Sequence, residues 1–221
     1  MKATADKLSG MIEAFEPADG PPPQTLVAFL RWCLKGAWPM FWVAFTVSCL
    51  AGGTEVVSAI VLGAVIDSTD GDPASWFDTN TLLLLGFLGF FLLVRPIAFG
   101  VSAALNAIMV QPNVNVLVQS RLHRWVLGHS TAFFDDDFAG RIAQKQMQTS
   151  RAVTDVLVEM ISVVAFAAAG VIGSIALLIT IDWRVAVILV VWFIAYLKLI
   201  AWFMPRIRVR SKERAARRAN V

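Results

Sequence analysis

The sequence predicts an all-α membrane protein with four long transmembrane helices. Of its 221 residues, 57% are hydrophobic and the mean hydropathy is +0.68, whereas soluble domains are roughly 45–50% apolar. The apolar residues gather in runs that exceed the roughly 20 helical residues needed to cross a bilayer. These runs lack the ten-residue alternation of a transmembrane β-barrel, so each is predicted to be a helix.

The segment before the first span has two parts. Residues 1–23 are polar and end in a Gly-Pro-Pro-Pro run, so we expect a flexible cytoplasmic lead without a signal peptide. Residues 24–38 are amphipathic, with Arg31 and Lys35 on the polar side. Two tryptophans in this stretch suit the headgroup level, which predicts a helix lying in the membrane interface.

Four spans follow, at about 39–66, 81–110, 156–181 and 183–204. An acidic turn that begins at Asp67 closes the first span. The third is rich in alanine and glycine, which allow a neighbouring helix to approach closely. Because Asp182 alone separates the third span from the fourth, these two helices are predicted to form an antiparallel hairpin.

Basic residues predict the orientation of the bundle. The turn 67–80 has no Lys or Arg, whereas the interval 111–155 and the tail after Met204 are both rich in them. Since Lys and Arg near span ends favour the cytoplasm, both termini and the long interval are predicted to be cytoplasmic. Helical spacing continues past the ends of the second and third spans, which predicts a protruding helical stalk.

The centre of the long interval is Phe133–Ile142, which reads Phe-Phe-Asp-Asp-Asp-Phe-Ala-Gly-Arg-Ile. Its aromatic side chains suit a pocket on a partner, and its glycine permits close backbone approach at a turn. An aromatic pair, a few polar residues, Gly-Arg and a helical run resemble the first intracellular loop of ABC exporters. The resemblance implies a coupling loop made of Phe133, Phe134, Asp135, Asp136, Asp137, Phe138, Ala139, Gly140 and Arg141.

The resemblance to ABC exporters extends from about residue 24 to the last residue. It includes Arg121-Leu122-His123-Arg124 before the loop and Pro205-Arg206 after the fourth span. The resemblance implies an elbow helix at 24–38 and a partial type-1 transmembrane domain at 39–221, with four of the family's six helices. Because helical spacing continues to Val221 without a stop signal, we expect an N-terminal fragment.

The resemblance further implies a function, partners and a location. The implied function is ATP-driven export across the plasma membrane, the inner membrane in bacteria, by a transporter made of two identical or different halves. The implied partners are membrane lipid, a nucleotide-binding domain, the second half and a small-molecule substrate of unknown identity; no nucleic acid is expected. The chain has no Gly-x-x-x-x-Gly-Lys-Ser/Thr loop. ATP and Mg²⁺ are therefore expected in the nucleotide-binding domain, and no cofactor in this chain.

The three consecutive aspartates, Asp135 to Asp137, leave an enzymatic alternative open. A stand-alone Mg²⁺-dependent membrane transferase would need carboxylates on one helix face. Consecutive residues point about 100° apart on a helix, which favours a solvated turn instead. A small accessory membrane protein is a further alternative.

Two ionisable residues lie inside predicted spans, where charges are costly and usually functional or paired. Glu55 is about eleven residues before the outer end of its span and Arg95 about fourteen after the outer end of the next, so their depths agree within roughly 5 Å. We expect them to pair or to share an aqueous cavity, either in the translocation pathway or as a structural contact. Pro96 predicts a kink in the second span.

The remaining reactive side chains have simple interpretations. Cys33 and Cys49 have no Cys-x-x-Cys spacing, so buried apolar roles are favoured over a disulfide or a metal site. His123 and His129 are expected to be solvated residues of a cytoplasmic helix.

Overall fold

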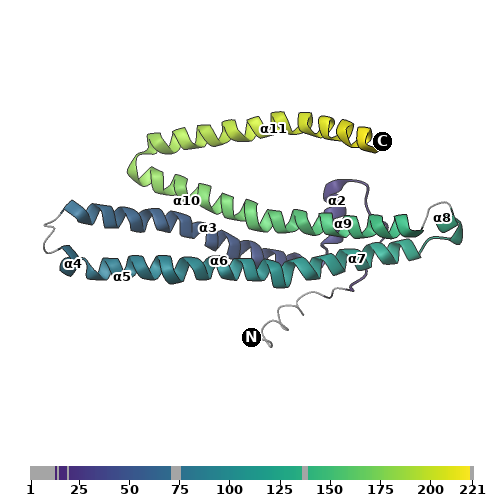
Figure 1. Cartoon of the computed structure of the whole chain (residues 1–221), viewed down its shortest axis with the longest axis horizontal. Coiled ribbons are helices and arrows are strands. Elements are labelled where there is room, and N and C mark those ends of the chain that lie inside the picture. The colour runs from purple at the N-terminus through teal and green to yellow at the C-terminus, as the bar shows by residue number, and fades with distance from the viewer. Residues whose placement is uncertain (1–12, 14, 19, 71–75, 136–138, 220–221) are drawn as a thin grey trace. The chain divides into compact units, whose positions relative to one another are not determined.

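The computed structural model describes residues 13, 15–18, 20–70, 76–135 and 139–219, and within them the structure is helical and contains no strand (Figure 1). Four helical stretches in this part of the chain are long and apolar enough to cross a membrane: Trp38–Asp67, Thr81–Leu127, Gly140–Ile181 and Trp183–Ile207. The prediction of an all-α, multi-pass membrane protein is confirmed. The chain divides into two compact units, Met1–Gly170 and Val171–Val221.

The elbow helix, α2, occupies Leu26–Cys33 and is shorter than the predicted 24–38. The chain turns at Gly36, whose φ of +86° lies in the left-handed region that favours glycine. A helix cannot continue through this conformation, so the amphipathic stretch ends before its last predicted residues. The first span, α3, begins after the turn and runs over Trp38–Asp67 with Pro39 in its first turn, where a missing N–H is tolerated.

The second span is a continuous helical run with two widened turns. After η1 (Ser68–Asp70) and α4 (Trp76–Thr79), the run consists of α5 (Thr81–Gly89), η2 (Phe90–Val94), α6 (Arg95–Ala104), η3 (Leu105–Val110) and α7 (Gln111–Leu127). Both η2 and η3 are π-helical. The Arg95 N–H bonds to the Phe90 carbonyl, five residues back, directly before Pro96. The same arrangement precedes Pro112, so a wide turn accommodates each proline.

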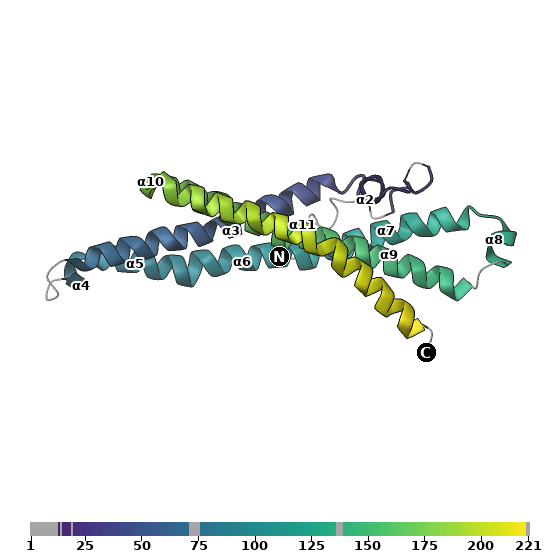
Figure 2. The ribbon, with the colours of Figure 1, turned by 90° about the horizontal axis from the view of Figure 1, so that it is seen from above.

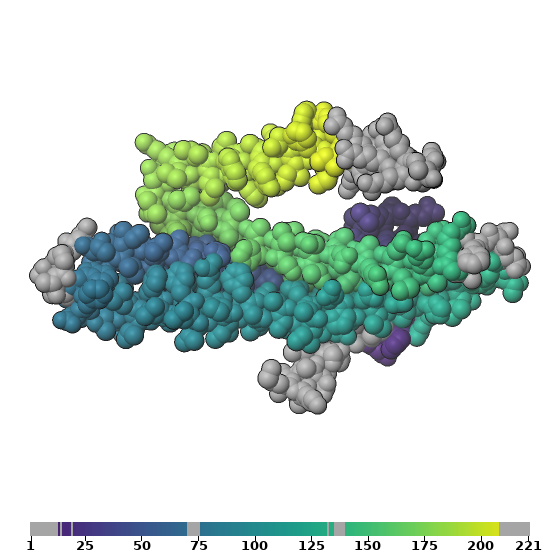
Figure 3. Space-filling model, in the orientation of Figure 1, coloured from purple at the N-terminus to yellow at the C-terminus, as the bar shows by residue number. Residues whose placement is uncertain are grey.

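The chain then reverses through a short helix, α8 (Thr131–Asp135), and returns as α9 (Ala139–Glu159), η4 (Met160–Ala165) and α10 (Phe166–Ile181). Helices α7 and α9, which we call the stalk, lie side by side with α8 at their far end (Figures 1 and 2). The space-filling view shows the two helices in continuous contact (Figure 3).

The main buried cluster of the first unit lies where the elbow, α3 and the stalk meet. Apolar side chains of η3 and α7 pack there against α9 and η4: Met109, Val110, Val114, Leu117, Val118 and Leu122 with Val153, Leu157 and Ile161. Cys33 and Met40 complete the cluster from the elbow side and are both fully buried. The cluster therefore joins the base of the stalk to the first span.

Helix α3 lies close to α10 at Gly52. A methyl group added at Gly52 would lie 2.5 Å from the carbonyl oxygen of Phe166 and 3.2 Å from the Cβ of Ala169. One turn earlier, the Cys49 thiol lies 3.6 Å from the Ala165 carbonyl oxygen. Glycine, which has no Cβ, is therefore required at position 52 for the two helices to touch.

The second unit contains the end of α10 and the long helix α11 (Trp183–Ala219). Asp182 separates the two helices and its Oδ1 accepts a hydrogen bond of 2.8 Å from the Arg184 N–H, which caps α11. The chain turns back between α10 and α11 (Figure 1). Helix α11 continues through Pro205, and the Arg206 guanidinium donates a 2.7 Å bond to the Trp202 carbonyl in the adjoining turn.

Candidate functional site

The far end of the stalk carries a row of aromatic rings in edge-on and tilted contact. The ring centroids of Trp125 and His129 are 4.9 Å apart, those of His129 and Phe133 are 4.5 Å apart, and those of Phe133 and Phe134 are 5.3 Å apart. His129 Nδ1 also lies 3.0 Å from the Trp125 carbonyl oxygen. The row bridges the break between α7 and α8 and fixes the orientation of the tip.

The structure places part of the predicted loop. Phe133 is 39% exposed and Phe134 is half-buried, whereas Asp135 ends α8 and Ala139 begins α9. Gly140 and Arg141 lie in the first turn of α9. Asp136, Asp137 and Phe138 lie outside the described residues. The expectation that His129 is solvated did not include its ring contacts with Trp125 and Phe133. The four-residue spacing of Trp125, His129 and Phe133 was the available signal for them.

The helices that carry this tip are much longer than a bilayer is thick. The two helical runs contain 47 and 42 residues, which at 1.5 Å per residue corresponds to about 70 and 63 Å. The hydrocarbon core of a bilayer is about 30 Å thick. Each run therefore has enough length to cross the membrane and to extend at least as far again outside it.

Arg121, on the buried side of α7, fastens the elbow to the stalk. It is 2% exposed. Its guanidinium donates hydrogen bonds to main-chain carbonyl oxygens of Glu16 (3.1 Å), Trp32 (2.9 Å), Cys33 (3.0 Å) and Lys35 (2.7 Å). The Glu16 carboxylate lies 3.8 Å from the same group. Carbonyls at the end of a helix lack partners within it, so Arg121 serves as a cap for α2.

The Cys33 thiol is buried against this cap. Its burial raises its pKa to about 12, and the positive charge of Arg121 partly opposes the increase. The thiol is therefore protonated at neutral pH, as a buried apolar residue would be. Cys33 and Cys49 are both free thiols, of which Cys33 is buried and Cys49 is partly buried.

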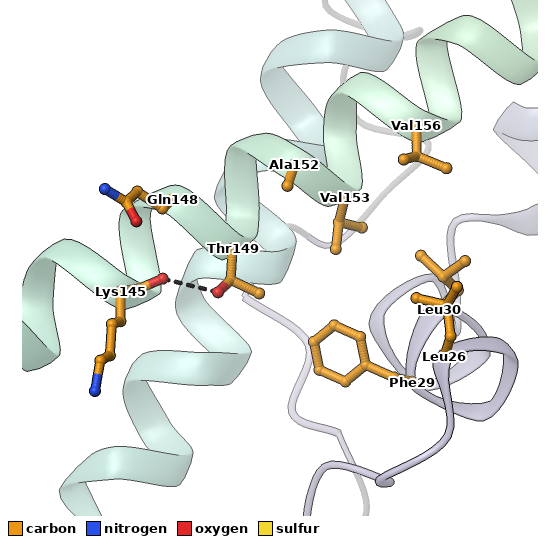
Figure 4. A pocket seen from close by; sticks show the side chains of 9 residues that line it. All are labelled: Leu26, Phe29, Leu30, Lys145, Gln148, Thr149, Ala152, Val153 and Val156. Carbon is orange, nitrogen blue, oxygen red and sulfur yellow. Dashed lines mark hydrogen bonds between the residues drawn. The ribbon is translucent and has the colours of Figure 1, made fainter. Parts of the chain in front are cut away.

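An apolar groove of about 460 Å³ separates the elbow from α9 (Figure 4). Leu26, Phe29 and Leu30 of α2 line one wall, and α9 supplies the other with Ala152, Val153 and Val156. Lys145 and Thr149 lie at the end of the groove toward the tip, where the Thr149 hydroxyl donates to the Lys145 carbonyl. The elbow is thus held to the stalk by polar bonds at its C-terminal end and by packing of its apolar side chains on the buried cluster.

Within the spans, the structure brings Glu55 and Arg95 together. Arg95 Nη2 lies 2.7 Å from Glu55 Oε1, which joins α3 to α6. The Arg95 guanidinium also lies over the rings of Phe91 and Phe99, at 5.9 and 5.8 Å from their centroids. About a third of each charged side chain is exposed, at 35% for Arg95 and 38% for Glu55. The ion pair therefore joins the two helices while about a third of each charged side chain stays exposed.

Reversing these two charges tests the contact. We expect Glu55→Arg or Arg95→Glu alone to lower the free energy of unfolding by about 2 kcal/mol, because either leaves two like charges together in the membrane. The double reversal restores an opposite-charge pair and should recover at least half of the loss. Thermal unfolding of the four proteins in lipid nanodiscs measures this cycle. A double variant no more stable than either single variant would contradict the pairing.

Metal binding finds no support in the described part of the chain. There, no three His, Cys, Asp or Glu side chains come close enough to hold an ion. Asp136 and Asp137 lie outside that part of the chain.

Comparison with known proteins assigns a family. The family model for the ABC transporter transmembrane region matches residues 41–221. A relative from Haemophilus influenzae, an "Uncharacterized ABC transporter ATP-binding protein", is 25% identical over 183 residues. This alignment takes in 80% of the chain and 29% of the relative, so the chain spans less than a third of the relative's length. No solved structure matches the chain.

A transporter transmembrane region consists of apolar helices, as this chain does. It also needs no catalytic constellation of its own, and the sequence contains none. The family match favours a transporter over the transferase and over the accessory protein. The chain therefore belongs to the family of ABC transporter transmembrane regions.

Proposed function

We propose that this chain forms part of the translocation pathway of an ATP-driven ABC exporter, and that Phe133–Arg141 couples it to a nucleotide-binding domain. The observation that carries the proposal is an aromatic tip held far from the spans by two helices that exceed the bilayer thickness. A partly exposed aromatic side chain is a typical anchor for a pocket on a partner. Phe133 and Phe134 are the anchors among the described residues.

The stalk can transmit a movement because α7 and α9 are packed along their shared core. Leu117, Val118 and Leu122 are buried between them together with Val153 and Leu157. Close-packed interiors shift as units and deform little. A displacement of the tip therefore moves both helices, and Arg121 carries the elbow with them. Nucleotide would drive the cycle by favouring one packing of the helices over another.

The location and partners follow from the same proposal. The tip would face the cytoplasm, as would both termini, and the membrane would be the plasma membrane, the inner membrane in bacteria. The basic residues of the stalk and the tail support this orientation. The partners would be a nucleotide-binding domain, a second transporter half and an exported small molecule. The nucleotide-binding domain would bind ATP and Mg²⁺, and this chain would contribute the coupling loop Phe133–Arg141.

Removing the tip aromatics tests coupling. In the assembled transporter, replacing both Phe133 and Phe134 with Ala should leave ATP hydrolysis largely intact and lower the number of substrate molecules exported per ATP about tenfold. The physical reason is that anchor residues of this type each contribute about 2 kcal/mol or more to an interface. Parallel measurement of ATP hydrolysis and substrate export in proteoliposomes gives the ratio.

Phe77→Ala is the matched control, because Phe77 is an exposed aromatic residue, at 68%, located before the second span and away from the stalk. It should leave the ratio unchanged. If the double variant exports as many molecules per ATP as the control does, the loop is not the coupling element.

A further inference from the structure

A polar cluster lies inside the membrane-spanning part of the first unit, away from the stalk. Ser48 of α3 and Ser102 of α6 share a hydrogen bond of 2.8 Å between their hydroxyls. Asn106 of η3 donates from Nδ2 to the Ser102 carbonyl oxygen at 3.1 Å. Asn106 is 8% exposed, and its Oδ1 has no hydrogen-bond partner in the described part of the chain.

The chemistry of the unpaired atom is fixed by its neighbour. The Ser102 carbonyl can only accept, so the Asn106 amide must present Nδ2 to it, and the free atom is the acceptor Oδ1. Buried polar atoms are almost always hydrogen-bonded, and bilayer lipid offers no substitute for a missing partner. The position therefore requires a group that carries an N–H or an O–H.

The same side chains line a cavity of about 290 Å³ with room for such a group. Its lining consists of Ser48, Ala51, Phe99, Ser102, Ala103, Asn106, Ser162 and Phe166, none of which is charged. The rings of Phe99 and Phe166, with centroids 5.5 Å apart, form an apolar wall. A cavity at the lower end of the usual size for ligand pockets, about 300–1,000 Å³, suits a small and neutral molecule.

The cavity adjoins the intramembrane ion pair. Phe99 lines the cavity and also lies 5.8 Å from the Arg95 guanidinium. Ser48 precedes Glu55 by seven residues, which is about two helical turns along α3. The ion pair and the cavity therefore share one face of α3 and α6, and a molecule in the cavity would rest against a side chain that contacts the pair.

We propose that this cavity binds a small neutral amphiphile. Its single N–H or O–H group donates to Asn106 Oδ1, and its hydrocarbon or aromatic body packs against Phe99 and Phe166. The serine hydroxyls beside Asn106 provide further hydrogen-bonding positions for the same polar end. The site is formed by the spans alone and does not depend on coupling to nucleotide.

Photolabelling in membranes tests the site. The full chain in phosphatidylcholine vesicles is exposed to a medium-chain aliphatic alcohol that carries a diazirine, or to its methyl ether, which lacks the donor. Labelled positions are then mapped by mass spectrometry. We expect the alcohol to label the residues lining the cavity about fivefold more than the ether does, as one hydrogen bond in an apolar site provides.

Asn106→Leu should lower alcohol labelling to the level of the ether. Asn113→Leu is the matched control. Like Asn106, Asn113 donates from its side-chain amide to the carbonyl four residues back, which is that of Met109 at 2.8 Å, but Asn113 does not line the cavity. It should leave the preference for the alcohol intact. Equal labelling by alcohol and ether, a preference that survives Asn106→Leu, or labelling that is not concentrated at the cavity would each overturn the proposal.

Discussion

Replacing Arg121 with Met is expected to release the elbow from the stalk and to lower the free energy of unfolding by about 3–5 kcal/mol. The substitution keeps an apolar stem of similar length but removes every donor that the carbonyls of Trp32, Cys33 and Lys35 receive from this side chain. A buried carbonyl left without a donor, as that of Cys33 would be, costs about 1–3 kcal/mol, and the partly buried carbonyls of Trp32 and Lys35 add to this loss. Hydrogen–deuterium exchange in nanodiscs should show faster exchange of the amides of α2.

Two other variants serve as comparisons for Arg121→Met. Arg124→Met removes an exposed arginine one turn further along α7, so it should change stability by less than about 0.5 kcal/mol. Arg121→Lys should fall between the two, because an ammonium cannot span the carbonyls that the planar guanidinium reaches. If amides of α2 exchange equally slowly in Arg121→Met and Arg124→Met, the side chain does not hold the elbow.

Replacing Gly52 with Ala is expected to separate α3 from η4 and α10 and to cost about 1–3 kcal/mol, the usual range for overpacking. The added carbon would lie 2.5 Å from the Phe166 carbonyl oxygen and 3.1 Å from its Cα. Both are main-chain atoms of a helix, so the clash cannot be relieved by rotation of a side chain. Thermal unfolding in nanodiscs measures the loss.

Gly53→Ala provides the control in the same helix. A carbon added at Gly53 meets no atom within 4 Å. Since Ala is favoured over Gly in a helix by about 1 kcal/mol, this variant should be as stable as the unsubstituted chain or more so. Equal stability of the two Ala variants would show that α3 does not rely on close approach at Gly52.

The spans could be predicted because apolar runs of bilayer length leave little freedom of interpretation. The turn at Asp182 followed from a single polar residue between two such runs. Arg121 could not be assigned its role, because a cation in a polar helix normally faces water and its burial depends on where the elbow folds back. Gly52 and Gly53 are adjacent in the sequence, and only the position of η4 and α10 distinguishes them.

Part of the candidate site could also be predicted from the sequence. Agreement in depth predicted that Glu55 and Arg95 would pair or share an aqueous cavity, since helix rise converts residue counts into height. The ring contacts of His129 were missed because the aromatic spacing crosses a helix break at Gly128. The unpaired Asn106 oxygen could not be predicted either. It is unpaired because the Asn106 amide N–H donates to the Ser102 carbonyl, and that bond depends on the local geometry of the helix.

The wide turns give the second and third spans different mechanical properties. A π turn is an α-helical turn with one surplus residue, and moving that residue along the helix swivels the segment it passes by about 100°. In the second span, Pro96 and Pro112 block such travel toward the C-terminal end of the helix, because neither has an N–H with which to restore the narrower turn. No proline follows η4 in the third span. Of these two spans, the third is therefore the one in which axial twisting of α9 against α10 meets no proline on either side of the wide turn.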